Sequence, residues 1–249
     1  MTTDLQKHEV ILCQDKEDLA DKAARSFVKL ANSILATKGV VNVALSGGST
    51  PKLLYERLLQ EDLVKSVEWG RIAFFVSDER SVSHESKDSN YGNAWRQLLE
   101  PLKLDQAMLH PTEGQDKDPA ASAAAYEEQI RNLVKPGGTG LPAFDIIFLG
   151  MGPDGHTASL FPGTAGLGET QKLVIKNHVD KLNTDRISFT FPLINAASNV
   201  IFLVAGEDKA EVLAEVMSDS GKYPCQKVKP SNGRLSWFVD RSAASKMNL

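Results

Sequence analysis

The chain has 249 residues, of which 42% are hydrophobic and 24% charged, and its formal net charge is −4 at pH 7. This acidic balance argues against a protein whose main task is to bind nucleic acid or an anionic membrane, because both need a surplus of positive charge. The length suits one large domain, and we expect residues 1–249 to form a single domain that folds without a metal or a disulfide.

The number of cysteines and the pattern of the N-terminal residues bear on the cellular location of the protein. Cys13 and Cys225 are too few for a metal cluster or a disulfide framework, which favours a reducing cytosol. The first residues show no basic start followed by an apolar core, so no secretory signal is predicted. The apolar runs fall short of the ~18 residues that a transmembrane helix needs. We therefore expect a soluble, cytoplasmic protein.

Short apolar runs alternate with longer helical patterns along the chain. Four of the runs are typical of strands covered on both faces in a parallel sheet, at residues 40–45, 72–76, 144–149 and 200–205. Apolar periodicity or composition predicts helices at residues 18–35, 51–63, 91–99, 119–134 and 209–217. The alternation predicts a three-layer α/β/α sandwich with a mostly parallel, Rossmann-like sheet.

The clearest interruption is the glycine- and proline-rich segment at residues 135–142. A domain boundary is one interpretation. Because the next predicted strand begins directly afterwards, we favour a surface loop.

The first candidate for a functional site is the segment SGGSTPK at residues 46–52, which joins a predicted strand to a predicted helix. Its glycines allow a ligand to approach the backbone, and the helix start offers free N–H donors to a phosphate. Ser49 or Thr50 is expected to cap the helix, with Pro51 at the first helical position. The alternative is a tight strand-to-helix turn without a ligand.

The second candidate follows the strand predicted at residues 72–76. Ligands of α/β sheets bind outside the carboxyl ends of the strands, which is where Asp78, Glu79 and Arg80 stand. Arg80 can form paired hydrogen bonds with a phosphate, oriented by the two acids. A solvated charge cluster is the alternative, and residues 88–91 (DSNY) are expected to cap the next helix.

The third candidate is GMGPDGHTASLFP at residues 150–162. Formally it contains the dinucleotide-binding pattern of glycines after a strand. That pattern needs a long following helix, however, and Pro162 would end one after about two turns. A glycine-rich loop that presents Asp154 and His156 as an acid/base pair explains the segment better, although a lone histidine is more often structural.

Two further cations stand beside predicted elements. Arg186 lies at the start of an alternating strand at residues 184–190. Lys209 lies near a helix start, where a positive charge opposes the helix dipole, which hints at a functional cation. An ordinary surface lysine remains the alternative.

Taken together, these motifs resemble the 6-phosphogluconolactonase family, within the larger group that includes glucosamine-6-phosphate isomerases. The resemblance covers most of the chain in family order. Residues 46–51 match the phosphate loop, 78–80 the Asp-Glu-Arg motif and 150–162 the most specific signature of the family. Ser83 and Ser188 depart from the family pattern, without removing a charged or acid/base group.

The resemblance implies an α/β/α fold of the isomerase type and hydrolysis of 6-phospho-D-glucono-1,5-lactone in the oxidative pentose phosphate pathway. His156 would be the general base, and Asp154 would orient it. Gly47, Gly48, Ser49 and Thr50, together with Arg80, Arg186 and Lys209, would hold the phosphate or stabilise developing negative charge. No cofactor and no metal are implied, and the expected partner is a small sugar-phosphate lactone.

Two other functions stay open. One is an amino-sugar-6-phosphate isomerase or deaminase. It is disfavoured because the isomerases' glutamate after Asp-Gly-His is missing and because Arg80 replaces their tyrosine. The other is a non-catalytic module that binds a sugar phosphate or a nucleotide, and the presence of both Asp154 and His156 argues against it. The oligomeric state is not predicted.

Overall fold

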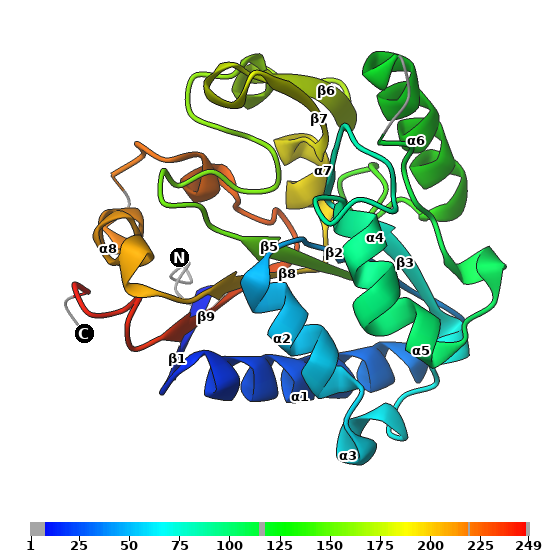
Figure 1. The fold of residues 1–249 in the computed structure, drawn as a ribbon. Coiled ribbons are helices and arrows are strands. Elements are labelled where there is room, and N and C mark those ends of the chain that lie inside the picture. The colour runs from blue at the N-terminus through cyan, green and yellow to red at the C-terminus, as the bar shows by residue number, and fades with distance from the viewer. Residues whose placement is uncertain (1–7, 115–117, 219, 248–249) are drawn as a thin grey trace.

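The computed structural model describes residues 8–114, 118–218 and 220–247 (Figure 1). Its centre is a six-stranded sheet in which every pair of neighbouring strands is parallel. In spatial order the strands are β1 (His8–Cys13), β9 (Arg234–Asp240), β8 (Asn199–Val204), β5 (Ile146–Gly150), β2 (Val41–Leu45) and β3 (Ile72–Val76). The predicted parallel sheet is confirmed, and the four strands expected from apolar runs are neighbours in it.

A second, three-stranded antiparallel sheet stands apart from the first. It consists of β4 (Asp78–Arg80), β7 (Thr184–Phe189) and β6 (Val174–Val179), with β7 in the middle. Only the strand at residues 184–190 was expected from the sequence. In β6 exposed and buried residues alternate, so it presents no continuous apolar run.

Helices cover both faces of the main sheet, as the predicted sandwich requires. They are α1 (Lys16–Leu35), α2 (Ser49–Leu58), α3 (Glu61–Val64), α4 (Asn90–Ala94), α5 (Glu100–Leu102), α6 (Pro119–Leu133), α7 (Phe191–Ala196) and α8 (Ala210–Met217). The first two pack on one face, and α6, α7 and α8 pack with the second sheet on the other (Figure 1). No helix in the described part of the chain is long and apolar enough to cross a membrane.

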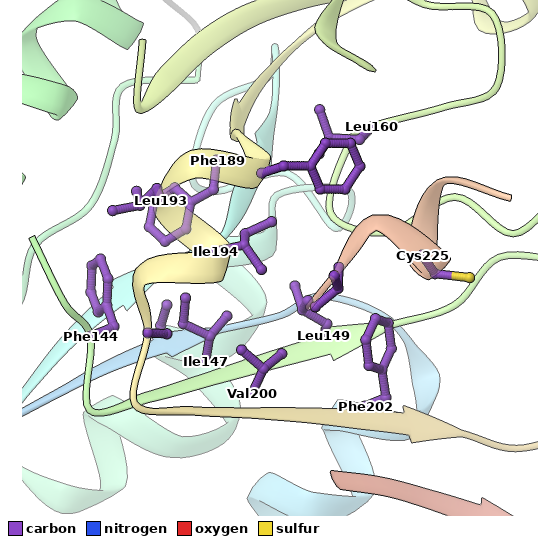
Figure 2. Close-up of a cluster of buried hydrophobic side chains, with 14 of the residues drawn as sticks. Phe144, Ile147, Leu149, Leu160, Phe189, Leu193, Ile194, Val200, Phe202 and Cys225 are labelled. Atoms are coloured by element: carbon purple, nitrogen blue, oxygen red, sulfur yellow. The ribbon is translucent and has the colours of Figure 1, made fainter. Parts of the chain in front are cut away.

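Strand alternation creates the two cores. In β2 the side chain of Val43 belongs to the core under α1, whereas the next residue, Ala44, belongs to the opposite one. Figure 2 shows the second core, where side chains of β5 and β8 meet those of α7 and of the end of β7. Because both faces of the central strands are buried, their sequences read as continuous apolar runs.

The predicted helix bounds differ from the observed ones where the chain turns. The helix expected at residues 51–63 is divided into α2 and α3, and the one expected at 91–99 is α4 followed by a π-helical turn, Trp95–Leu99. The glycine- and proline-rich segment forms the turn from α6 to β5, in which the amide of Gly137 donates to the carbonyl of Leu141 at 2.9 Å. It is a loop, as favoured above.

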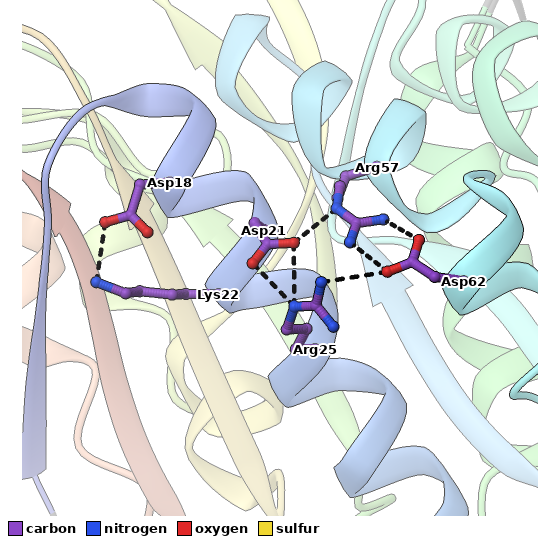
Figure 3. Close-up of polar contacts among 6 residues, drawn as sticks. All are labelled: Asp18, Asp21, Lys22, Arg25, Arg57 and Asp62. Carbon is purple, nitrogen blue, oxygen red and sulfur yellow. Dashed lines mark hydrogen bonds and ion pairs between the residues drawn. The ribbon is translucent and has the colours of Figure 1, made fainter.

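An ion-pair network fixes α2 and α3 against α1 (Figure 3). Arg57, whose side chain is only 19% exposed, contacts Asp21 of α1 at 2.7 Å and both carboxylate oxygens of Asp62 at 2.7 and 2.6 Å. Arg25 completes the network through the same two acids. Because α2 starts at the glycine loop, this network helps to hold that loop in place.

Candidate active site

The three motifs converge at one edge of the main sheet. β5, β2 and β3 are neighbours and parallel, so their carboxyl ends lie side by side. The glycine loop follows β2, the Asp-Glu-Arg motif follows β3 and the histidine loop follows β5. Such an edge is the usual ligand site of open α/β sheets.

The glycine loop differs from the prediction in how the helix begins. Ser49 is already the first residue of α2, Gly48 is the cap residue with a φ of 116°, and no side chain caps the helix. The expected cap by Ser49 or Thr50 is therefore wrong, and Pro51 is the third helical residue. As a result no side-chain cap occupies the first N–H groups of α2, and they are available to an anion.

Gly47, the first of the two loop glycines, has no room for a side chain. A Cβ atom at Gly47 would lie 1.7 Å from Oδ1 of Asn90, so only glycine fits beside this side chain. The side-chain nitrogen Nδ2 of Asn90 donates to the carbonyl of Asp78 at 2.8 Å, while the buried Oδ1 of the same side chain has no hydrogen-bond partner within the described residues. An acceptor therefore lies unpaired beside the glycine loop.

A pocket of about 270 Å³ opens over this loop. It is lined by Ser46, Gly47, Gly48, Ser49, Lys52, Tyr55, Arg80, Lys87, Asn90, Asn93 and Gln97. The structure thus brings Arg80 to the loop, as predicted, and Thr50 is outside the lining set. Lys52 and Lys87 were missed, because nothing in their local sequence distinguishes them from surface lysines.

Glu79 of the Asp-Glu-Arg motif is structural. Its fully buried carboxylate accepts hydrogen bonds from the amides of Arg80, Asn90 and Tyr91 at 2.7 to 2.8 Å and from the hydroxyl of Ser89 at 2.9 Å. Burial raises the pKa of Glu79, and these four hydrogen bonds oppose the rise. The side chain thereby ties β4 to the start of α4, where Ser89 is the cap residue, as expected for residues 88–91.

Two arginines are direct cross-strand neighbours in the second sheet. Arg80 of β4 pairs in register with Arg186 of β7, which places their Cβ atoms about 5 Å apart. Neither guanidinium forms an ion pair with a described carboxylate, and the buried Nε of Arg186 has no hydrogen-bond partner there. Burial, reinforced by the charge of Arg80, lowers the pKa of Arg186 below its usual value. Such a pair is stabilised by a bound anion.

The histidine loop holds an acid/base pair. Nδ1 of His156 lies 2.5 Å from Oδ1 of Asp154, so Nδ1 carries the proton shared with the carboxylate, and Nε2 forms no hydrogen bond with the described residues. The loop is tight. The amide of Gly152 donates to the carbonyl of His156 at 2.9 Å, and a Cβ atom at Gly152 would lie 2.1 Å from Nδ1 and Cε1 of the ring. Between this loop and β6 there is only a 3-10 turn, Ala165–Gly168, and no α-helix, which agrees with rejecting a dinucleotide site.

Burial and charge set the protonation of this pair. Burial lowers the pKa of His156, and the hydrogen bond and charge of Asp154 oppose that effect without overcoming it. Although burial alone would raise the pKa of Asp154, hydrogen bonds from Lys181 and His156 hold it at about 2. At neutral pH the pair is therefore a carboxylate next to a neutral imidazole, which is the form of a general base.

Residues from distant parts of the chain complete the surroundings of His156. Its ring stacks on Phe161 with centroids 3.9 Å apart, and the ammonium of Lys181 lies 4.8 Å from the centre of the same aromatic ring. Ser159 of the same loop donates to Oδ2 of Asp78 at 2.7 Å, which joins the histidine loop to β4. Sequence reasoning missed these contacts, since no spacing pattern connects the elements involved.

The structure does not bring Lys209 into the glycine-loop pocket. Its ammonium pairs with Asp208 at the start of α8, beyond the carboxyl end of β8. Its side chain is only 19% exposed. Across the described residues there is no group of three or more histidine, cysteine or acidic side chains placed to hold a metal.

Comparison with known proteins agrees with this arrangement. Residues 14–237 match the family described as glucosamine-6-phosphate isomerases/6-phosphogluconolactonase. The chain therefore belongs to this family. A 6-phosphogluconolactonase from a Nostoc species is 36% identical over 246 residues, which cover 98% of this chain and 100% of the relative. A relative named 6-phosphogluconolactonase 3, chloroplastic, from Arabidopsis thaliana is 34% identical, covering 99% of this chain and 78% of the relative.

Solved structures give the same result. The 6-phosphogluconolactonase from Trypanosoma cruzi has a TM-score of 0.88 and 30% identity, with 98% of each chain covered. A monomeric glucosamine-6-phosphate deaminase, at 20% identity and a TM-score of 0.79, shares the fold. Within the family the chain groups with the 6-phosphogluconolactonases, which are lactone hydrolases. The cytoplasmic location expected above stays a prediction.

Proposed function

We propose that this chain hydrolyses 6-phospho-D-glucono-1,5-lactone to 6-phosphogluconate, with His156 as the general base. The pathway expected from the resemblance, the oxidative pentose phosphate pathway, follows from that substrate. The observation that carries the proposal is the Asp154–His156 pair. Nε2 of His156 forms no hydrogen bond with the described residues, and the pair lies at the same sheet edge as a cation-lined pocket.

The reaction needs one group that removes a proton and later returns it. A water molecule attacks the lactone carbonyl while Nε2 of His156 takes its proton, and Asp154 stabilises the imidazolium that forms. The tetrahedral intermediate then collapses, the bond to the ring oxygen breaks, and the imidazolium protonates that oxygen. The products are a carboxylic acid, which loses its proton to solvent near neutral pH, and a free hydroxyl on the same open chain, so no cofactor enters the balance.

The other end of the substrate is a phosphate dianion. The first amides of α2, at Ser49 and Thr50, and the loop formed by Gly47 and Gly48 provide donors without side-chain competition. Arg80 and Arg186 supply charge. Lys209 is the remaining candidate cation, and it contributes only if its ion pair with Asp208 opens.

A direct assay separates this proposal from the two alternatives. Freshly generated 6-phosphogluconolactone should be opened by the protein well above its spontaneous rate, and glucosamine-6-phosphate should release no ammonia. Titration with NADPH should give no saturable binding. Release of ammonia without lactone opening would instead favour the isomerase alternative, and inactivity toward both substrates would favour a binding module.

A further inference from the structure

Lys181 connects the second sheet to the acid/base pair. It lies on the 3-10 turn Asp180–Leu182 between β6 and β7, and Asn183, in a left-handed conformation, ends that turn. The ammonium of Lys181 forms an ion pair with Oδ2 of Asp154, whereas Oδ1 of the same carboxylate binds Nδ1 of His156. Each oxygen of Asp154 thus has a partner from a different part of the chain.

Phe161 places Lys181 and His156 against one surface. The imidazole stacks on the phenyl ring at 3.9 Å with an angle of 20° between the planes, and the ammonium lies 4.8 Å from the centre of the phenyl ring. Aromatic rings attract both a stacked imidazole and a nearby cation. Four side chains from two separate elements therefore form one contact group around the candidate base.

We propose that Lys181 is a positioning residue for lactone hydrolysis. It holds the Asp154 carboxylate with Oδ1 directed at His156, and its charge offsets that of the carboxylate at the imidazole. This proposal rests on the role of His156 as base.

The geometry explains why one anchor is insufficient. A carboxylate that contacts only the imidazole can rotate about its side-chain bonds, and the imidazole then loses its fixed orientation. A second contact on the other oxygen removes that freedom. The side chain of Lys181 is 55% exposed, and exposed ion pairs contribute little to folding stability, so we expect its effect to be on catalysis.

The charges that face His156 come from three elements. Asp154 lies on its own loop, Asp78 begins β4 and Lys181 follows β6. Burial lowers the pKa of His156, the two carboxylates raise it and Lys181 lowers it. Burial is thus the main reason that the imidazole stays unprotonated near neutral pH, and the charge of Lys181 acts in the same direction against the two carboxylates.

The test is the pH profile of kcat and kcat/KM for Lys181→Met and Lys181→Arg. Removing the cation makes protonation of His156 easier, so the acid limb should move to higher pH. In Lys181→Met the plateau kcat should fall roughly 3- to 30-fold with little change in KM, the range expected for coupled neighbours. Lys181→Arg keeps the charge and should restore most of both properties.

Lys222→Met is the matched control. Lys222 is an exposed lysine that pairs with Glu215 at 2.9 Å and lies 5.0 Å from the centre of the Tyr223 ring, but it does not touch Asp154. The pH profile and kcat of Lys222→Met should equal those of the wild type. If Lys181→Met also equals the wild type, the proposal is overturned.

A double variant distinguishes positioning from direct contact with substrate. In an Asp154→Asn background, Lys181→Met should have almost no further effect on the plateau kcat, because its target is already altered. A further rise in KM there would mean that Lys181 binds the substrate itself and would refute the proposal. If the wild type does not open the lactone at all, the proposed function fails. If the wild type is active and Lys181→Met has the same kcat and pH profile, only the proposal for Lys181 fails.

Discussion

Replacing Arg186 by methionine should make the protein more stable and much less active. In the absence of substrate Arg186 faces the like charge of Arg80 and has a buried, unpaired Nε. Like charges directly opposite in a sheet cost about 0.2–1 kcal/mol, and an unpaired buried donor costs about 1–3 kcal/mol. Methionine retains most of the aliphatic packing.

We therefore expect Arg186→Met to gain roughly 1 kcal/mol in the free energy of unfolding, which for a chain of this size raises Tm by about 2–4 °C. The same change removes one or two charge-assisted hydrogen bonds to the substrate phosphate, each worth about 1.5–3 kcal/mol. For a single lost bond, kcat/KM on the phosphorylated lactone should fall about 10- to 150-fold.

Thermal unfolding and steady-state kinetics on phosphorylated and unphosphorylated gluconolactone measure both effects. The unphosphorylated lactone has no partner for the guanidinium, so its hydrolysis should change little. Arg131→Met, which removes the i,i+4 ion pair of an exposed arginine with Glu127, is the control and should leave activity unchanged. A variant with a clearly lower Tm, or one that slows both lactones equally, would refute the assignment of these arginines to the phosphate.

Three further predictions concern the histidine loop, the candidate base His156 and the ion-pair network that joins α1, α2 and α3. Gly152→Ala should leave the fold intact but lower kcat ~10²-fold or more, because its Cβ would displace the His156 ring. The control is Gly150→Ala, where a Cβ meets nothing within 4 Å and kcat should hardly change; equal rates in both variants would contradict the prediction. The acid limb of kcat/KM should reflect a His156 pKa below 6.5, and Asp154→Asn should move that limb to lower pH, since the carboxylate raises the imidazole pKa. The substrate phosphate titrates near ~6 with either protein, so a limb that does not move would show that Asp154 does not act on the titrating group. Arg57 lowers the pKa of Asp62 from 3.8 to about 2, so Asp62→Asn should lower Tm near pH 6, and the difference in Tm from the wild type should vanish as pH falls through 3.8 toward 2. The control is Glu61→Gln, which removes a more exposed partner of Lys65 and should change Tm less at any pH. A Tm difference for Asp62→Asn that stays constant with pH would count against the ion pair.

The parallel sheet and the place of the site could be predicted because they depend on local signals. Buried strands such as β3 are continuous apolar runs, and the sites sit where those runs end in glycine or charged residues. The second sheet gave a weaker signal, since β4 has three residues and β6 alternates. The same limit applies to Glu79, whose role depends on four donors that the fold brings to it.

The contacts that complete the site are tertiary. Lys181 and Asp154 are 27 residues apart, and only the packing of the second sheet over the β5 loop brings them together. The cap at Gly48 was missed for a different reason. Serine and threonine are preferred at the N-cap of helices, but the turn after β2 requires a positive φ there and places Gly48 at the N-cap of α2.

The proposed hydrolysis depends most directly on His156, and a single comparison tests that role. The kcat for freshly generated 6-phosphogluconolactone, corrected for spontaneous opening, should be measured for the wild type and for His156→Ala at the pH of the plateau. Loss of a general base predicts a decrease of about 10²–10⁴-fold with unchanged thermal unfolding. A folded His156→Ala protein that opens the lactone at the wild-type rate would contradict the account.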